Sequence, residues 1–121
     1  MSQVVLFVCP HGAAESRLAA AFFARVAPSG WTATSAGLDP GPELSPTAGT
    51  LLAGTDAEAF LDRKPPRSLA QVVAPDRIVG IDCGPDGVTD HWELRHREFD
   101  AAMRDEIRAR AEALASELGG G

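Results

Sequence analysis

Two cysteines, Cys9 and Cys83, are the residues of this 121-residue chain with the clearest capacity for chemistry. Each follows a short apolar, β-branched run typical of a buried strand, so both thiols are expected at the carboxyl ends of strands. Ligands of open parallel sheets bind at that edge. Cys9 also faces the start of a predicted helix, whose free N–H groups stabilise a thiolate. The alternative is that both cysteines are ordinary buried residues, since free cysteine is commonly interior.

The turn after Cys9 is built of small residues, so its backbone N–H groups could converge on an anion. The residues expected to line such a site are Pro10, His11, Gly12, Ala13, Ala14 and Glu15. His11 could also act as a base or tune the neighbouring thiol. The three histidines are scattered without metal-ligand spacing, so we expect no metal site and no cofactor.

Alternating strand and helix patterns must position these residues. The expected strands are 4–8, 31–35, 77–82 and 91–94, and the expected helices are 14–27, 45–54 and 97–118. In the last helix the apolar residues, Phe99 among them, recur at three- and fourfold spacing. Residues 55–75 are compatible with either a short strand or helical turns. The alternation predicts one α/β domain over residues 1–118 with a mainly parallel sheet, followed by a frayed tail at 119–121.

Composition excludes several classes of protein. A net charge of −6 disfavours a nucleic-acid binder and a protein that binds anionic membranes. Two cysteines are too few for a secreted disulfide scaffold. The N-terminal apolar run is too short for a signal peptide or a membrane span. We therefore expect a cytoplasmic protein.

Five sequence segments together resemble the low-molecular-weight protein tyrosine phosphatases and the related thioredoxin-coupled arsenate reductases of bacterial type. The family pattern at the N-terminus is an apolar strand, Cys, five residues, Arg, Ser and a helix. The segments are VVLFVCPHGAAESRLAAAFF at 4–23, SAGL at 35–38, LSPTA at 44–48, RIVGIDCG at 77–84, and HW at 91–92 with MRDEIRARAEAL at 103–114. They cover most of the chain in the family's order.

The resemblance implies a three-layer α/β sandwich with a mainly parallel four-stranded sheet in the order 2-1-3-4 and helices on both faces. It implies that Cys9 is the thiolate nucleophile and that Ser16 donates a hydrogen bond to it. The loop 10–15 would hold a small oxyanion, namely phosphate, sulfate or arsenate. In the reductase branch Cys83 would be the resolving thiol, which leaves a Cys9–Cys83 disulfide.

The most important departure from the family pattern is Glu15, which occupies the position of the family's arginine. That arginine makes a bidentate fork on the oxyanion, and a carboxylate there reverses the local charge. Arg17 lies two positions on, roughly 200° around a helix axis, and is a poor substitute.

Three other departures concern the general acid, the redox relay and the loop. The family's Asp-Pro is missing at 93–97, where His96, Glu93 or the nearby Asp90 could supply a proton. The third cysteine of the reductases is absent after Cys83. His11-Gly12 stands where the family has Gly-Asn, and Gly12 can still supply a left-handed turn.

Three hypotheses follow. The first is a degenerate member of the family, a pseudoenzyme with an impaired oxyanion loop. The second is an active cysteine-dependent phosphatase or arsenate reductase that uses non-standard groups, with His11, Arg17 and His96 in the missing roles. The third is a thiol redox or interaction module that uses Cys9 and Cys83, with a possible protein partner.

Overall fold

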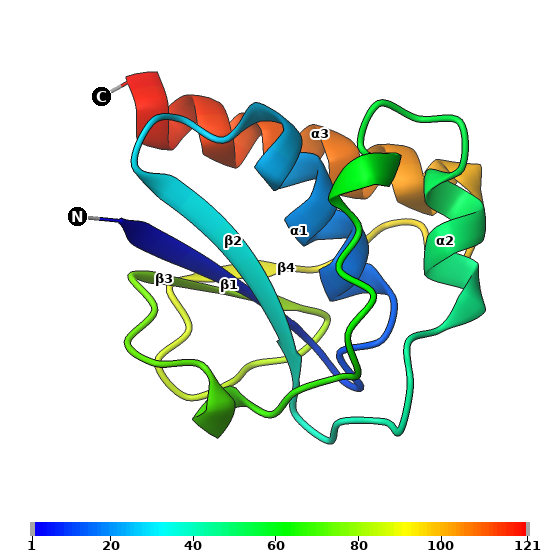
Figure 1. The fold of residues 1–121 in the computed structure, drawn as a ribbon, viewed down its shortest axis with the longest axis horizontal. Helices are drawn as coiled ribbons and strands as arrows, with labels where there is room; N and C mark the ends of the chain where they lie inside the picture. The colour runs from blue at the N-terminus through cyan, green and yellow to red at the C-terminus, as the bar shows by residue number, and fades with distance from the viewer. Residues whose placement is uncertain (1, 121) are drawn as a thin grey trace.

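A computed structural model describes residues 2–120 (Figure 1). The strands are β1 (Gln3–Cys9), β2 (Trp31–Gly37), β3 (Arg77–Ile81) and β4 (Asp90–Trp92). The α-helices are α1 (Glu15–Val26), α2 (Pro46–Leu52) and α3 (Ala101–Gly120), and two 3₁₀ turns are η1 (Glu58–Phe60) and η2 (Leu69–Gln71). No helix among these residues is both long and apolar enough to cross a membrane.

The four strands form one all-parallel sheet in the order β2-β1-β3-β4, as predicted. Cys9 at the end of β1 pairs with Gly37 at the end of β2, and Val8 pairs with Gly80 in β3. The carboxyl ends of these three strands therefore meet at one edge of the sheet, where the predicted site residues lie.

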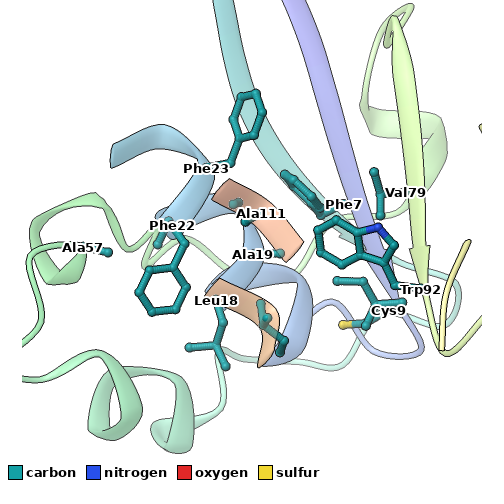
Figure 2. Close-up of a cluster of buried hydrophobic side chains, with 14 of the residues drawn as sticks. Phe7, Cys9, Leu18, Ala19, Phe22, Phe23, Ala57, Val79, Trp92 and Ala111 are labelled. Carbon is teal, nitrogen blue, oxygen red and sulfur yellow. The ribbon is translucent and has the colours of Figure 1, made fainter. Parts of the chain in front are cut away.

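The two faces of the sheet are covered unequally. Phe7 and Cys9 belong to the larger core cluster, shared with α1, α2 and α3, which Figure 2 shows in close-up. The Phe7 ring lies 5.6 Å from the Trp92 ring, centroid to centroid. Leu6 and Val8 point to the opposite face, where η2 and its neighbours cover them. We expected helices on both faces of the sheet. In the structure α-helices cover one face and a single 3₁₀ turn lies against the other.

Several predicted boundaries shift. The strand expected at 31–35 continues to Gly37, because Ala36 is buried and pairs with Val8. The helix expected from 97 begins only at Ala101, because the Asp100 carboxylate accepts the Met103 N–H and ends the preceding loop there. Placing Phe99 on that helix was therefore wrong. Helix α3 continues to Gly120, and residue 121 lies outside the described residues.

Candidate functional site

A pocket of about 350 Å³ opens at the carboxyl end of β1. Its walls contain five of the six residues predicted to bind an oxyanion, together with the predicted nucleophile. The lining residues are Cys9, Pro10, His11, Ala13, Ala14, Glu15, Ser45 and Phe99. Gly12 alone of the predicted set is turned away, toward the end of β2.

Cys9 lies at the base of this pocket and is 1% exposed. Its Sγ is 3.1 Å from the Oγ of Ser16, which is also buried, and the two share a hydrogen bond. When the thiol ionises, the Ser16 hydroxyl can turn to donate to the thiolate. The structure places Cys9 and Ser16 side by side at the N-terminus of α1.

The carbonyl groups of the loop after β1 are all held from outside the loop. The carbonyl oxygens of Cys9, Pro10, His11 and Ala13 accept the N–H groups of Leu38, Asp39, Gly41 and Ser45 at 2.9–3.3 Å. The Gly12 carbonyl accepts instead from Nε of Arg17 at 2.8 Å. Because the carbonyl and the next N–H of a trans peptide point in opposite directions, the N–H groups are left on the pocket side.

Within residues 2–120 the N–H groups of His11, Gly12, Ala13 and Ala14 find no backbone or side-chain acceptor. Together with the free N–H groups at the start of α1, they form a concave set of donors. Such a set is suited to the oxygens of a small oxyanion. We call these residues, 9–15, the anion loop.

Two glycines make the loop geometry possible. Gly12 has φ +66°, which glycine adopts without strain. A Cβ on Gly12 would lie 2.6 Å from the backbone N of Gly37, so the anion loop and the end of β2 touch backbone to backbone. Gly37 belongs to the SAGL segment singled out in the sequence.

Glu15 lines the same pocket as Cys9, and its carboxyl group is partly buried near His11. Burial raises the pKa of Glu15, and the nearby Asp82 carboxylate adds to this rise. Its own backbone N–H and His11 act in the opposite direction. The carboxylate is therefore poorly stabilised here, and it opposes the entry of a second anion.

His11 lines the same pocket but its side chain is exposed, and its Nδ1 lies 3.1 Å from the Asp39 carbonyl oxygen. It faces Glu15 rather than forming a hydrogen bond with Cys9. His11 thus lies in the wall of the pocket, near Glu15.

Cys83 follows the end of β3 but packs on the other face of the sheet from Cys9. Its Sγ donates to the Val8 carbonyl at 3.4 Å, and both cysteines are free thiols. Burial, with a contribution from Cys9, raises the pKa of Cys83 to about 11. Cys83 borders a separate hollow of about 380 Å³ with Asp82, Gly84, His91, Glu93 and Arg97.

The other residues considered for the missing roles lie outside the pocket. His96 is exposed and its Nδ1 is 2.9 Å from Oε1 of Glu106, on the outer side of α3. Asp90 makes a bidentate ion pair with Arg77, and Glu93 points into the Cys83 hollow. Arg17 is 1% exposed beneath the anion loop, so it cannot replace the family's arginine inside the pocket.

The sequence analysis did not place Ser45 and Phe99 in the pocket, nor Asp82 near Glu15. Ser45 begins the predicted helix 45–54 and caps it, since its Oγ accepts the Thr47 N–H at 3.3 Å. Phe99 fitted the helical spacing of α3. The positive φ of Asp82, 54°, is a backbone feature that no sequence pattern predicts.

Within residues 2–120 no group of three histidine, cysteine or acidic side chains is placed to hold a metal ion.

No family model matches the chain, and no curated protein does either. Among solved structures, the arsenate reductase of Archaeoglobus fulgidus is 30% identical, with 97% of this chain and 99% of that one aligned and a TM-score of 0.68. The thioredoxin-dependent arsenate reductase of Corynebacterium glutamicum is 26% identical over 97% of this chain and 62% of its own, with a TM-score of 0.76.

The low-molecular-weight protein tyrosine phosphatase of T. tengcongensis shares the fold at 18% identity, with a TM-score of 0.69 over 96% of this chain and 99% of that one. The likeness therefore extends from the anion loop through the whole parallel sheet to α3. By its sequence identity and its fold, this chain belongs to the family of low-molecular-weight protein tyrosine phosphatases and arsenate reductases.

Proposed function

We propose that this chain is a pseudoenzyme of its family, a protein that keeps the thiol and the anion loop but is impaired in phosphatase chemistry. The observation that carries the proposal is the carboxyl group of Glu15 inside the Cys9 pocket, where the resemblance places an arginine. The proposed ligand is a small oxyanion, phosphate, sulfate or arsenate, bound weakly by backbone N–H groups.

The charge at position 15 decides the chemistry because an oxyanion gains charge at its oxygens in the transition state. An arginine stabilises that charge with two parallel hydrogen bonds. Loss of one such preorganised donor costs about 3–4 kcal/mol of transition-state stabilisation, and the repulsion from a carboxylate adds to it. Since His96, Glu93 and Asp90 do not line the pocket, the leaving group also lacks a general acid from the 90–97 segment.

The decisive experiment compares hydrolysis of p-nitrophenyl phosphate by the native chain, Cys9→Ser, Glu15→Arg and the double variant Glu15→Arg/Cys9→Ser. We expect the native chain to hydrolyse the substrate no faster than Cys9→Ser does, and Glu15→Arg to exceed that background rate at least about 100-fold. The double variant controls for background hydrolysis. A native rate that disappears in Cys9→Ser would overturn the proposal.

A second candidate is an active Cys9 enzyme in which Glu15 and His11 move the protons. It is favoured by the position of both groups in the wall of the Cys9 pocket and by the raised pKa of Glu15, which lets a carboxyl group hold a proton nearer neutral pH. The same variants separate the two candidates. If the native chain is an active enzyme, Glu15→Arg should lose a Cys9-dependent rate. If it is a pseudoenzyme, Glu15→Arg should gain such a rate.

A Cys9–Cys83 redox module is the remaining alternative, and the geometry supports it less. Cys83 would have to leave the Val8 carbonyl and cross from the second face of the sheet. Its raised pKa also makes it a slow nucleophile near neutral pH. Peptide mapping under non-reducing conditions after mild oxidation tests this alternative, which requires an intramolecular Cys9–Cys83 peptide pair.

A further inference from the structure

Arg17 is among the largest fully buried side chains of the protein, and the chemistry of the pocket does not use it. It is the third residue of α1 and is 1% exposed. Its Nε donates to the Gly12 carbonyl at 2.8 Å and its Nη1 to the Asp62 carbonyl at 2.7 Å. Nη2 has no partner. A buried guanidinium with one unsatisfied nitrogen costs stability, so its two hydrogen bonds merit an explanation.

The Gly12 carbonyl is the exception in the anion loop. Its neighbours, the carbonyl oxygens of Cys9, Pro10, His11 and Ala13, accept backbone N–H groups from residues 38–45, and no side-chain substitution removes those donors. Only the Gly12 carbonyl is held by a side chain. The orientation of the Gly12–Ala13 peptide therefore depends on the identity of residue 17.

That peptide matters because its other end faces the pocket. In a planar trans peptide the carbonyl oxygen of Gly12 and the N–H of Ala13 point in opposite directions. If the carbonyl is held away from the pocket, the N–H is aimed into it. A flip of this peptide would replace a donor in the pocket with a carbonyl oxygen, which repels an anion.

Arg17 is itself held in place by Asp62, on the side away from the anion loop. The Asp62 carboxylate lies 3.9 Å from Arg17 and accepts from Nη2 of Arg67 at 2.8 Å. Arg67 also donates to the Ser35 carbonyl at 2.9 Å, and its own carbonyl accepts the Gly37 N–H at 2.9 Å. Arg17 is thereby fixed against the end of β2, which is also the strand end that Gly12 touches.

We propose that Arg17 is a positioning residue of the anion loop: it holds the Gly12 carbonyl outward and so aims the Ala13 N–H at a bound oxyanion. The proposal rests on the proposed use of the loop N–H groups as an oxyanion site. Arg17 acts from behind the loop and touches no ligand. The loss of the family's arginine at position 15 and the presence of an arginine at position 17 are then two separate features, one electrostatic and one conformational.

The test uses Glu15→Gln as the parent, so that no carboxylate competes in the pocket, and inorganic phosphate as the probe. Isothermal titration gives the affinity, and ¹⁵N–¹H spectra follow the amide of Ala13. In the Glu15→Gln/Arg17→Met variant we expect at least about tenfold weaker phosphate binding. We also expect loss of the phosphate-induced shift at Ala13, with the shifts of the His11 and Gly12 amides retained.

The matched control is Glu15→Gln/Arg77→Met. Arg77 is likewise paired with a carboxylate, that of Asp90, but it is only partly buried and lies at the start of β3, away from the anion loop. This variant should lose stability, measured by urea unfolding, while phosphate affinity and the Ala13 shift stay at the parent values. A merely structural role for Arg17 predicts that the two arginine variants behave alike.

Should Arg17→Met fail to fold, Arg17→Lys in the same parent keeps the charge but lacks the Nε–H that faces Gly12. It should bind phosphate about threefold more weakly and shift the Ala13 amide in the free protein. Parent-like phosphate affinity in a folded Met or Lys variant would overturn the role of Arg17 alone. No phosphate binding by the Glu15→Gln parent would overturn the oxyanion site itself, and the Arg17 proposal with it.

Discussion

The carboxyl ends of β1 and β3 are neighbours in the sheet, and each has a thiol close by: Cys9 is the last residue of β1, and Cys83 lies just after β3. The segments that follow these strand ends are held in place by different kinds of hydrogen bond. After β1, the carbonyl groups of the anion loop are held by backbone donors of residues 38–45, with Arg17 the one side-chain donor. After β4, by contrast, it is backbone N–H groups that are held, and the acceptors are carboxylates. Asp82 accepts the Leu94 N–H at 3.0 Å, and Glu106 accepts the N–H groups of Arg95 and His96 at 3.0 Å.

This difference explains how position 15 can change charge without loss of the fold. A loop held by its backbone keeps its shape when most of its side chains change, so the anion loop tolerates Glu15. The segment after β4 depends on ionised side chains, so its shape responds to pH. One strand end is sensitive to backbone changes and the other to protonation.

The largest expected effect is at Gly12, where the backbone has no freedom. In Gly12→Ala the new methyl group would press on the backbone of Gly37 and the residue would be held at a positive φ. We expect a loss of about 2–4 kcal/mol of unfolding free energy by urea denaturation. Gly41→Ala, in the adjacent loop and with open space around it, is the matched control. A loss of unfolding free energy below about 1 kcal/mol for Gly12→Ala would show that the anion loop and the end of β2 are not in backbone contact.

The Cys83 thiol should react slowly with alkylating reagents. Since the pKa of Cys83 is about 11 against an ordinary 9.0, its thiolate population at pH 8 is about 100-fold smaller than that of an ordinary thiol. Alkylation by iodoacetamide, followed by peptide mass spectrometry, should be slower at Cys83 by that factor than at an exposed reference cysteine. A Cys83 rate near that of the reference would contradict the contrast between the strand ends.

Glu106 should make the β4 end sensitive to acid. Burial alone would raise its pKa, but the N–H groups of Arg95 and His96, the His96 ring and Arg110 lower it to about 2. The stability that it contributes is therefore present above about pH 4.5 and is lost as the pH falls toward 2. Glu106→Gln should cost about 1–2 kcal/mol at pH 7 and progressively less in acid.

Asp105→Asn is the control for Glu106→Gln, because Asp105 is an exposed neighbour paired only with Arg104. It should change the unfolding free energy by less than about 0.5 kcal/mol at either pH. An equal effect of the two variants would mean that Glu106 does not organise the segment after β4.

Glu15 should show the opposite dependence on pH, with a smaller effect. Because burial raises its pKa, the native state favours the neutral carboxyl group, and stability falls as the pH rises through that pKa. Glu15→Gln should therefore be more stable than the native chain at pH 7 and equal to it below about pH 4, by thermal unfolding in both buffers. Lower stability of Glu15→Gln at pH 7 would mean that a cation partners the carboxylate.

The sequence alone was sufficient for the strand order, because the resemblance covered the chain, and for the clustering of residues 9–16. Short continuous apolar runs rich in β-branched residues are typical of buried strands, and small residues before a helix are typical of a turn. The segment 55–75 was not predictable, because its short 3₁₀ turns have too few residues to establish a period. Phe99 was placed on the helix because it continues the apolar spacing of α3. The helix begins only at Ala101, where the Asp100 carboxylate caps it.

The presence of a carboxylate at position 15 was a fact of the sequence, and so was the absence of an Asp-Pro. Only the tertiary structure decided what surrounds them. It turned His96 toward Glu106, packed Cys83 on the opposite face from Cys9, and buried Arg17 beneath the Gly12 carbonyl. The physical reason is that residue types fix the charges and local conformations, whereas the direction of a side chain depends on partners supplied by distant segments of the chain.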